Sequence, residues 1–469
     1  MNWHGKRVTV AGLGVSGIPA ARVLHQLGAE VTVVNDGDDE RARGQAAELE
    51  KLGVTVRLGD GDTLPEGTEL VVTAPGWRPD KPLFTAASAA GVEIWGDVEL
   101  AWRLRGPDAA PWLAVTGTNG KTTTVRMLAS ILEAAGLRTA AVGNIGVSLI
   151  DAVAGEETYD VLAVELSSYQ LHWAPSPRAH SAAVLNLAPD HLDWHGSMAA
   201  YAADKGRIYE GNSVACVYNA ADRATEDLVR EADVDEGCRA IGFTLGTPGP
   251  SQLGVVDGIL VDRAFVENRR EHAQELAQVS DVTPPAPHNI ANALAAAALA
   301  RAYGVEPAAV RDGLRAFRPD PHRIEHVADV ADVAYVDDSK ATNTHAAEAS
   351  LAAYDPIVWI AGGLAKGATF DELVAASAKR LRGVVLIGAD RALIREALAR
   401  HAPEVPVVDL DRTDTGAMSA AVREAARLAR PGDTVLMAPA CASMDMFANY
   451  NKRGEAFADA VRALAAEHA

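Results

Sequence analysis

Residues 114–123, AVTGTNGKTT, constrain the fold of this chain more than any other stretch. An apolar run at 112–115 leads into a turn with two glycines, and a helical pattern over 124–135 follows. A strand, a glycine-rich turn and a helix in this order present backbone N–H groups and a helix N-terminus to a phosphate. Lys121 is then placed to reach the terminal phosphates of a nucleotide, and Thr122 to bind Mg²⁺. The stretch predicts an α/β domain that binds ATP.

The match to the pattern G-x-x-x-x-G-K-[ST] is not strict, because Val115 occupies the position of the first glycine. The alternative is a tight strand-to-helix turn, rich in glycine and threonine, that binds nothing. We favour phosphate binding, because a lysine and a hydroxyl residue stand in the required order at the start of the helix.

Composition narrows the class of protein. A chain of 469 residues is too long for one core and indicates several domains. The formal net charge of −20 argues against a nucleic-acid partner. The three cysteines form no C-x-x-C pair, so we expect neither a disulfide framework nor a thiolate zinc site. We find no signal-peptide pattern and no apolar run long enough for a bilayer, and therefore expect a cytoplasmic protein without membrane insertion.

Strand-like and helical patterns alternate along most of the chain, which predicts parallel α/β domains. Proline-containing segments at 105–108 (RGPD) and 318–321 (RPDP) separate three such regions. We predict domains over 1–107, 108–318 and 319–469.

The stretch from 211 to 287 predicts short strands and turns, with helical periodicity only near 271–277. An alanine-rich helix is predicted at 288–303. Strands are predicted at 7–11, 31–35, 70–73, 112–115, 161–165, 182–186, 333–336, 357–361, 384–387, 407–410 and 434–437.

Residues 12–17, GLGVSG, fit the pattern G-x-G-x-x-G between a predicted strand and a predicted helix. Asp36 ends the next predicted strand, where a carboxylate can bind a ribose. Such a turn can hold the pyrophosphate of a dinucleotide or of a UDP-sugar, and it can also be a tight turn without a ligand. Taken alone, the pattern indicates a dehydrogenase.

Polar residues follow the strands of the second region, at the edge where ligands of parallel sheets collect. Glu165 is placed to bind Mg²⁺ and Ser167 to contact a ligand; the alternative for Glu165 is an exposed acidic residue in a loop. His191 and His195 have the i, i+4 spacing of a zinc site, but no H-E-x-x-H pattern or thiolate accompanies them. We expect His191 near Mg²⁺ and the phosphates, and His195 in solvent. Lys205 lies on a predicted helix facing the same cleft, and a surface charge is the alternative.

In the third region, Asp338 and Lys340 follow a predicted strand and form a polar ligand site. Arg323 offers a guanidinium for a phosphate, and Lys366 lies on a glycine turn. Cys441 has no evident base partner, so we expect a packed residue and not a nucleophile.

Together these segments resemble the Mur ligase family, the ATP-dependent amide ligases of cell-wall precursor synthesis, and the related folylpolyglutamate synthetases. The loop 116–122, TGTNGKT, matches the ATP signature of the family, and the resemblance covers the whole chain. It implies an N-terminal Rossmann-like domain for a UDP-linked substrate, a central P-loop domain with a parallel sheet for ATP, and a C-terminal Rossmann-like domain for an amino acid and ATP. Finer matches at 321–323, 338–343 and 440–453 favour the member that adds D-glutamate to UDP-N-acetylmuramoyl-L-alanine.

Carried over by position, the resemblance implies a role for each matching residue. The catalytic group would be Lys121, Glu165, His191 and Lys205. One Mg²⁺ would be held by Thr122 and Glu165, and a second by His191 and by Lys205 as a carbamate. ATP would be bound by Gly117, Thr118, Asn119, Gly120, Lys121, Thr122, Thr123, Asn289, Arg323 and Asp338. The UDP-linked substrate would be bound by Val15, Ser16, Asn35, Asp36, Gly76, Asn144 and Ser167, and D-glutamate by Lys340, Thr342, Lys366, Ser443, Met444 and Tyr450. We expect the protein to act as a monomer.

Three other interpretations of the sequence stay open. An NAD-dependent dehydrogenase explains residues 12–17 but leaves the 116–122 loop and the third region without a purpose. A sister ligase adding L-alanine, a diamino acid or a dipeptide is closer, although no D-N-P-R segment typical of the diamino-acid enzyme is present. A non-catalytic nucleotide-binding regulator would tolerate the change Lys205→Ala, whereas a catalytic carbamate would not.

Overall fold

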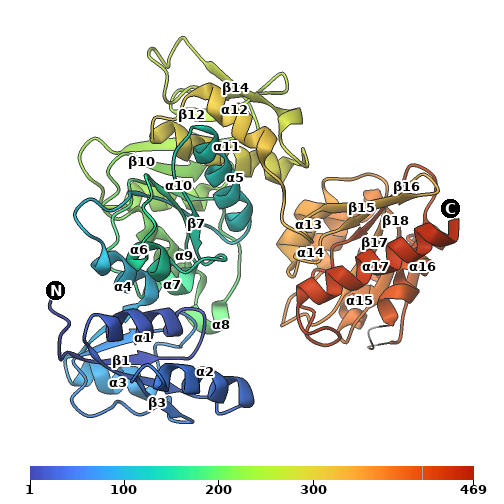
Figure 1. Ribbon diagram of the computed structural model, residues 1–469. Helices are drawn as coiled ribbons and strands as arrows, with labels where there is room; N and C mark the ends of the chain where they lie inside the picture. Colours follow the sequence, from blue (N-terminus) through green and yellow to red (C-terminus); the bar gives the residue numbers. More distant parts are fainter. Residues whose placement is uncertain (413, 415, 469) are drawn as a thin grey trace. The chain divides into compact units, whose positions relative to one another are not determined.

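The computed structural model describes residues 1–412, 414 and 416–468. The chain divides into two compact units, one of residues 1–282 and 290–317 and the other of residues 283–289 and 318–469 (Figure 1). The first unit contains two sheets and the second contains one. Each sheet alternates with helices along the sequence, as the patterns predict for an α/β protein.

The first sheet is fully parallel, in the order β3-β2-β1-β4-β5. Its central strands are short runs of buried β-branched residues, such as β1, which form pleated surfaces readily. The strand order reverses direction between β1 and β4, where parallel sheets bind ligands. The elements are β1 (Arg7–Ala11), α1 (Gly17–Gln26), β2 (Glu30–Asn35), α2 (Glu40–Glu50), β3 (Thr55–Leu58), β4 (Leu70–Thr73), α3 (Pro82–Ala89), β5 (Glu93–Gly96) and α4 (Asp97–Leu104).

The second sheet has nine strands in the order β14-β13-β12-β11-β10-β9-β6-β8-β7, and only β12, β13 and β14 pair antiparallel. Its first half comprises β6 (Trp112–Thr116), α5 (Lys121–Ala134), β7 (Ala141–Gly143), α6 (Leu149–Ala154), β8 (Leu162–Glu165), α7 (Ser168–His172), β9 (Ser181–Val184), α8 (Leu192–His195) and α9 (Met198–Gly206). Its second half comprises η1 (Arg207–Tyr209), β10 (Ala215–Asn219), α10 (Arg223–Glu231), β11 (Arg239–Phe243), β12 (Gln252–Val256), β13 (Ile259–Asp262), β14 (Gln274–Gln278), η2 (Val279–Asp281), α11 (Pro287–Ala302) and α12 (Pro307–Ala316).

Two predictions in the stretch 211–287 are wrong. The helical periodicity near 271–277 does not form a helix, because residues 274–278 pair with β13 as strand β14. The sequence pattern also misses the helix α10, where Thr225 is the one fully buried residue and Leu228 and Val229 pack, partly buried, against the core. An Asp222 cap and the ion pair Glu226–Arg230 also stabilise it.

The first two sheets share one hydrophobic core. A continuous cluster of buried side chains runs from Val8 and Val33 in the first sheet, through Trp95 and Leu100, to Val164 in the second. Because these side chains pack together, both sheets belong to one unit.

Two thiols that lie far apart in the sequence meet in this unit. The Sγ atoms of the free cysteines Cys216 and Cys238 are 3.9 Å apart, within reach of a thiol–thiol hydrogen bond. Their proximity could not be read from the sequence, because it follows from the parallel pairing of β10 with β11.

The second unit is built on a six-stranded sheet in the order β15-β16-β20-β17-β18-β19, parallel except for the β15–β16 pair. Helices α13, α14 and α15 cover one face of the sheet, and α16 and α17 cover the other (Figure 1). The elements are β15 (Glu325–Val330), β16 (Val333–Asp337), α13 (Thr344–Leu351), β17 (Ile357–Gly362), α14 (Asp371–Ser377), η3 (Ala378–Arg380), β18 (Leu381–Ile387), α15 (Arg391–His401), β19 (Val407–Asp409), α16 (Ala417–Leu428), β20 (Thr434–Met437) and α17 (Tyr450–His468).

No helix in the described ranges has the length and apolar character needed to cross a membrane.

Candidate active site

Three strand ends meet at one edge of the second sheet. Strand β6 pairs in parallel with β8 on one side, Val115 opposite Glu165, and with β9 on the other, Thr116 opposite Val184. The loops that follow these strands therefore leave the sheet together. This register brings the turn 117–120 beside Glu165 and beside the loop that carries His191.

The turn 117–120 has the backbone of a phosphate-binding loop. Gly120 precedes α5 with φ +85, and a Cβ there would meet Asn292 Oδ1 at 2.4 Å, so only glycine fits. Lys121 curls over the turn and donates from Nζ to the carbonyls of Gly117 at 2.9 Å and Thr118 at 2.8 Å. Asn119 N donates to Asn186 Oδ1 at 2.9 Å, which fixes the turn to the loop after β9. The predicted ATP-binding residues Thr122 and Thr123 lie half-buried in the first turn of α5.

Glu165 is buried, with 2 % of its surface exposed, and is not the exposed loop residue of the alternative interpretation. Its Oε1 accepts a hydrogen bond of 2.9 Å from Asn144 Nδ2, while its Oε2 is buried without a hydrogen-bond partner in the described part of the chain. An unpaired buried carboxylate oxygen is costly unless a cation or donor satisfies it. Together with the Thr122 hydroxyl on the neighbouring turn, it fits a hard divalent cation with oxygen ligands.

Lys205 on α9 is almost fully buried, with 1 % of its surface exposed. Its Nζ donates to Gly117 O at 2.9 Å and Thr116 Oγ1 at 3.3 Å, so it reaches the same turn as Lys121. Burial, and then the charge of Lys121, lower the pKa of Lys205 well below its usual range. The alternative of a surface charge is therefore excluded, and the lowered pKa favours the neutral, nucleophilic form of the amine.

His191 stands at the start of α8 in a left-handed conformation, with φ 53. Its ring centroid lies 4.8 Å from that of Tyr169, and 44 % of its side chain is exposed. Burial lowers the pKa of His191, which favours the neutral imidazole that a metal ion binds.

The expectation that His195 is solvated is wrong. Its side chain is fully shielded, its Nδ1 lies 2.9 Å from Asp204 Oδ2 and its Nε2 lies 3.0 Å from Ser168 Oγ. Its ring stacks on Tyr169 at 5.5 Å and 4°. Asp204 also accepts from His172 Nδ1 at 3.0 Å, so a buried carboxylate ties α7, α8 and α9 together. The i, i+4 pair therefore consists of a buried histidine, His195, bound to Asp204 and Ser168, and a partly exposed one, His191.

The glycine-rich turn 12–17 of the first sheet is equally constrained. A Cβ on Gly17 would meet Gly12 O at 1.9 Å, so the turn closes only with glycine there. Leu13 N donates to Asn35 Oδ1 at 2.9 Å, and Ser16 Oγ donates to Asp97 Oδ2 at 2.8 Å. Val15 projects from the turn with 87 % of its surface exposed, which leaves an apolar side chain beside backbone N–H groups.

Other residues predicted to bind the UDP-linked substrate lie on neighbouring strand ends. Asp36, after β2, pairs with Lys81 Nζ at 2.9 Å. The loop after β4 reaches the second sheet, because Gly76 O accepts from Trp194 Nε1 at 3.2 Å and Arg78 Nη1 donates to Asp193 O at 2.8 Å. Asn144 follows β7, and Ser167 caps α7.

In the second unit, a buried arginine joins two strand-end loops. Arg453 on α17, with 1 % of its surface exposed, donates from Nη2 to Ser339 O at 2.9 Å and from Nη1 to Cys441 O at 3.0 Å. Its Nε donates to Ser339 Oγ at 3.0 Å. The loops after β16 and β20, which carry Lys340 and Ser443, are thereby fixed to one helix.

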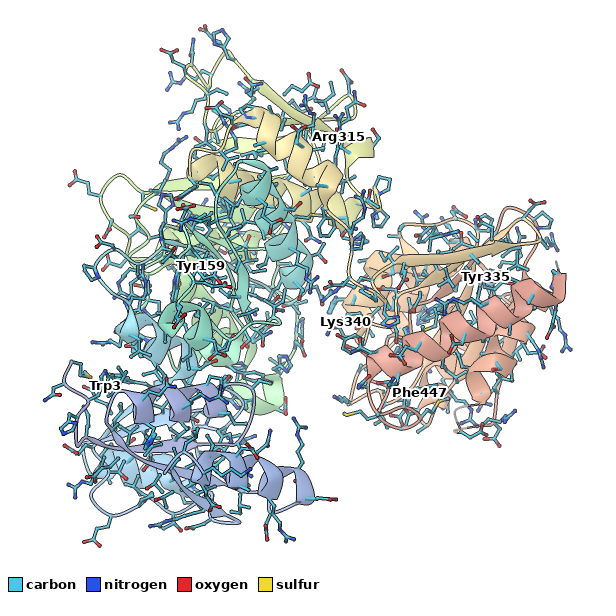
Figure 2. The ribbon with its side chains drawn as sticks, in the orientation of Figure 1. Trp3, Tyr159, Arg315, Tyr335, Lys340 and Phe447 are labelled. Atoms are coloured by element: carbon cyan, nitrogen blue, oxygen red, sulfur yellow. The ribbon has the colours of Figure 1, made fainter. Side chains whose placement is uncertain are left out.

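The predicted ligands of D-glutamate lie on these loops and their neighbours. Lys340 Nζ lies 4.0 Å from the centroid of the Tyr450 ring, a cation–π contact. Figure 2 labels Lys340 on the second unit. Ser443 is buried and Met444 is 63 % exposed. Lys366 is exposed in the loop after β17, and Thr342 is half-buried after β16.

Three predicted ATP-binding residues lie in this unit. Burial raises the pKa of Asp338 to about 6, and its oxygens accept from Ser350 Oγ and from Ile324 N. Arg323 Nε lies 3.8 Å from Asp320 Oδ2. Asn289 Nδ2 donates to Pro284 O at 3.3 Å.

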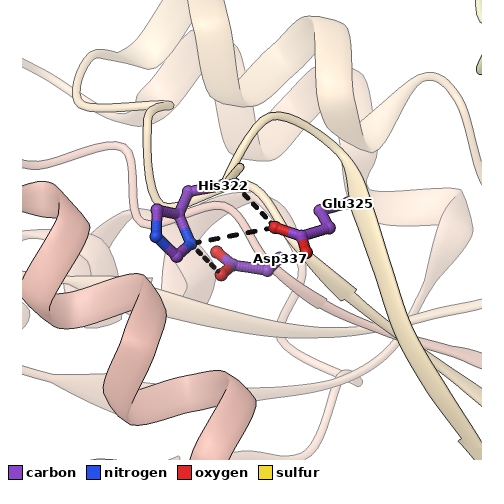
Figure 3. Close-up of side chains that lie close together, drawn as sticks. All are labelled: His322, Glu325 and Asp337. Atoms are coloured by element: carbon purple, nitrogen blue, oxygen red, sulfur yellow. Dashed lines mark hydrogen bonds and ion pairs between the residues drawn. The ribbon is translucent and has the colours of Figure 1, made fainter. Parts of the chain in front are cut away.

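Next to Arg323, His322 holds its loop in place. Its Nδ1 lies 2.7 Å from Asp337 Oδ2, its backbone N donates to Glu325 Oε2 at 2.9 Å, and the hydrogen bond to Asp337 raises its pKa (Figure 3). A Cβ on Gly454 would lie 2.2 Å from His322 Nδ1, so α17 packs directly on the pair. The three side chains form a closed ion-pair cluster.

Sequence reasoning assigned no role to three buried residues that hold loops of the site, Asp97, Asp204 and Arg453, although Arg453 ends the matched stretch 440–453. Their partners lie on other helices and loops, so no local pattern marks what each one does. The structure reveals their role because a charged side chain that is buried between loops must have specific partners there.

Comparisons with known proteins agree with this architecture. Residues 6–96 match the MurD-like N-terminal domain of Mur ligases, residues 115–300 the Mur ligase middle domain, and residues 322–441 the glutamate ligase domain of Mur ligases. Two solved structures share the fold. They are MurF ligase from Thermotoga maritima in complex with ADP (16 % identity, TM-score 0.58, covering 99 % of this chain and 96 % of that one) and UDP-N-acetylmuramate-alanine ligase MurC from the same organism (19 %, TM-score 0.57, 98 % and 100 %).

Two curated relatives are far more similar. Proteins named UDP-N-acetylmuramoylalanine--D-glutamate ligase from Streptomyces avermitilis and Streptomyces coelicolor are 85 % and 86 % identical over 465 and 467 residues. The first alignment covers 99 % of this chain and 100 % of the relative, and the second covers 99 % of each. The chain belongs to the Mur ligase family.

Proposed function

We propose that the chain joins D-glutamate to UDP-N-acetylmuramoyl-L-alanine at the expense of ATP, releasing ADP and phosphate in the synthesis of a peptidoglycan precursor. The observation that carries the proposal is the 85–86 % identity, over nearly the whole of each chain, to relatives named for this reaction. The dehydrogenase interpretation does not explain the turn 117–120, nor why Lys121 and Lys205 both donate hydrogen bonds to it.

In the reaction, a carboxylate oxygen of the L-alanyl group attacks the γ-phosphorus of ATP, the bond to the β–γ bridging oxygen breaks, and an acyl phosphate and ADP form. The amine of D-glutamate then attacks the acyl carbon, loses a proton, and phosphate leaves. The N–H groups of the turn 117–120 and the Lys121 ammonium hold the phosphates and offset their charge. Mg²⁺, when bound by Thr122 and Glu165, would supply further positive charge at the transferred phosphoryl group.

We assign the remaining site residues as the family resemblance implies. In the second unit, Asn289, Arg323 and Asp338 bind ATP, and Lys340, Thr342, Lys366, Ser443, Met444 and Tyr450 bind D-glutamate. In the first unit, Gly117, Thr118, Asn119, Gly120 and Thr123 bind ATP together with Lys121 and Thr122. The UDP-linked substrate is bound by Val15, Ser16, Asn35, Asp36, Gly76, Asn144 and Ser167. The exposed apolar side chain of Val15 and the unpaired Oε2 of Glu165 support ligands at two of these places.

Lys205 carries a carbamate in the active enzyme and, with His191, binds a second Mg²⁺. A neutral amine adds CO₂ and loses a proton to give the carbamate, and the lowered pKa of the buried Lys205 favours that neutral form. Because Lys205 Nζ donates to the Gly117 carbonyl, the carbamate would lie beside the turn 117–120. The change Lys205→Ala should abolish turnover, and a small added carboxylate should restore part of it.

The three-domain division, 1–107, 108–318 and 319–469, belongs to the same proposal. Each range contains one sheet, and each family match lies within one range. We also expect a monomer, which light scattering would test, and a cytoplasmic location, where ATP is available.

Phosphate release tests the proposal directly. The purified protein is given Mg²⁺, ATP and UDP-N-acetylmuramoyl-L-alanine, with one amino acid at a time. Release that depends on D-glutamate, and not on L-glutamate, L-alanine or a diamino acid, is the expected result. Release with another amino acid would point to a sister ligase, and no release with any amino acid would contradict the ligase activity.

A further inference from the structure

A buried carboxylate joins the two sheets of the first unit at their predicted substrate loops. Asp97 is the first residue of α4, directly after β5, and 8 % of its surface is exposed. Its Oδ2 accepts from Ser16 Oγ at 2.8 Å and from Gln170 Nε2 at 3.1 Å. Ser16 and Gln170 lie 81 and 73 residues away in the sequence. One oxygen atom thus connects two loops that fold onto different sheets.

On the first sheet, Asp97 determines where the Ser16 hydroxyl points. Ser16 stands at the N-cap of α1, where a serine normally accepts a hydrogen bond from the first turn of its own helix. Here it forms no such cap and donates to Asp97 instead. The first N–H groups of α1 are therefore not used by this side chain, as a site for a pyrophosphate requires.

On the second sheet, Asp97 acts through Gln170. Gln170 and Ser167 form a reciprocal capping box at the start of α7, in which Ser167 N donates to Gln170 Oε1 at 3.0 Å and Gln170 N to Ser167 Oγ at 3.2 Å. Ser167 follows Glu165 by two residues, and the family resemblance implies that it faces the muramoyl part of the UDP-linked substrate. Holding the Gln170 side chain therefore holds this loop.

A role in packing alone does not explain why an acidic side chain stands at position 97. Its Oδ1 is buried without a hydrogen-bond partner among the described residues, and burial raises its pKa. A half-satisfied buried acid is costly, and such groups are retained most often at functional sites.

We propose that Asp97 is a positioning residue that fixes the turn 12–17 and the loop at Ser167 relative to each other, so that one UDP-linked sugar can contact both. The proposal rests on the proposed function, since it assumes a substrate with a nucleotide end and a muramoyl end.

Glu99 provides a matched control on the same helix. Its side chain is fully buried, its Oε1 pairs with Arg103 Nε at 2.7 Å, and its Oε2 accepts a 2.8 Å hydrogen bond from Ser176 N, in the loop between α7 and β9. It therefore also connects α4 to the region of the second sheet, but neither Arg103 nor Ser176 is predicted to bind substrate. Glu99→Gln should lower stability and leave substrate binding unchanged.

The test is equilibrium binding of two probes, UDP and UDP-N-acetylmuramoyl-L-alanine, to the full-length protein and its variants. The wild type should bind the sugar-linked probe more tightly than UDP. Asp97→Ala should reduce the affinity for the sugar-linked probe by roughly tenfold or more, and Ser16→Ala should cost less affinity in that background than in the wild type, because both changes break one connection. Gln170→Ala should reduce only the advantage of the sugar-linked probe over UDP. In turnover, Asp97→Ala should raise the KM for the UDP-linked substrate and leave the KM for ATP unchanged.

An Asp97→Ala variant that loses no more affinity than Glu99→Gln would overturn the proposal. If Asp97→Ala does not fold, Asp97→Leu serves instead, since it keeps the branched shape of the side chain and removes the oxygen that accepts from Ser16 and Gln170; wild-type affinities for both probes in that variant would overturn the proposal as well. Binding needs no turnover, so a failure of the ligase assay with D-glutamate and a failure of this coupling are separate outcomes.

Discussion

The two glycine-rich turns of the first unit share a backbone design and differ in the side chains around it. Residues 12–17 follow β1 and precede α1, and residues 117–120 follow β6 and precede α5, in each case with a glycine that no other residue could replace. The first turn is held by Asn35 and Asp97 and displays an exposed valine, whereas two lysines reach into the second. Backbone N–H groups suffice to bind a phosphate, but transfer of a phosphoryl group also requires positive charge that stabilises the transition state. The difference supports the proposal that the first turn binds the UDP-linked substrate and the second acts in catalysis.

Removal of divalent cations should have the largest effect, because it should stop phosphate release at the second turn and leave UDP binding at the first turn intact. With excess EDTA, phosphate release should fall by roughly 10³-fold or more, because Glu165 Oε2 and the Thr122 hydroxyl lose the ion that they fit. Binding of UDP, followed by calorimetry in the same buffer, should not change. A parallel loss of UDP affinity would mean that the first turn also depends on a metal ion.

Lysine substitutions near the two turns should have opposite kinetic signatures. Lys121→Ala should lower kcat by roughly 10²–10³-fold, since it removes a charge that acts on the transferred phosphoryl group. Lys81 forms an ion pair with Asp36, which is predicted to bind the UDP-linked substrate. Lys81→Ala should therefore raise the KM for that substrate by a few-fold and leave kcat unchanged. Steady-state kinetics with each substrate varied would show the split. Equal effects on kcat would contradict the division of labour.

Alanine in the first turn should be tolerated at one glycine and not at another. A Cβ at Gly17 would overlap Gly12 O, so Gly17→Ala should cost about 1–3 kcal/mol of unfolding free energy and weaken UDP binding. A Cβ at Gly14 meets no atom within 4 Å, so Gly14→Ala should leave stability unchanged. Denaturant unfolding checks both variants. Equal destabilisation would mean that the turn adjusts as a whole.

The smallest expected effect concerns Val15. Because 87 % of its surface is exposed, Val15→Ser should not change stability, while the loss of apolar contact with a bound ligand should weaken UDP-substrate binding by about 1 kcal/mol, or roughly fivefold. A titration of wild type and variant with the UDP-linked substrate measures it. Unchanged affinity would remove Val15 from the binding site.

The strands and the placement of polar residues at their ends could be predicted from the sequence. Runs such as 357–361 are apolar, β-branched and short, and the structure has β17 at Ile357–Gly362. Parallel sheets place the carboxyl ends of such strands together, so the amino-acid pattern alone is enough to select Glu165 and Asp338 as site candidates.

What could not be predicted depends on pairing between distant residues. The segment 271–277 has good helix formers, but pairing with β13 makes part of it a strand, so tertiary context overrides propensity. His195 looks like any polar loop residue until Asp204 and Ser168 are brought to its two ring nitrogens. Asp97 acquires its role only because two sheets meet at its carboxyl group.

The seam between the first two sheets has a consequence for protein engineering. The segment 105–108 has the composition of a linker, yet Trp102 and Trp112 contact edge-to-face across it with centroids 4.9 Å apart, and the Arg105 guanidinium lies 3.9 Å from the Trp102 ring centroid. Because two indole rings and a guanidinium group pack together at the junction, the segment is held by side-chain contacts and does not act as a hinge. Residues 1–107 are therefore a poor cassette for grafting onto another ligase, because the graft would carry an apolar face shaped for one particular neighbour.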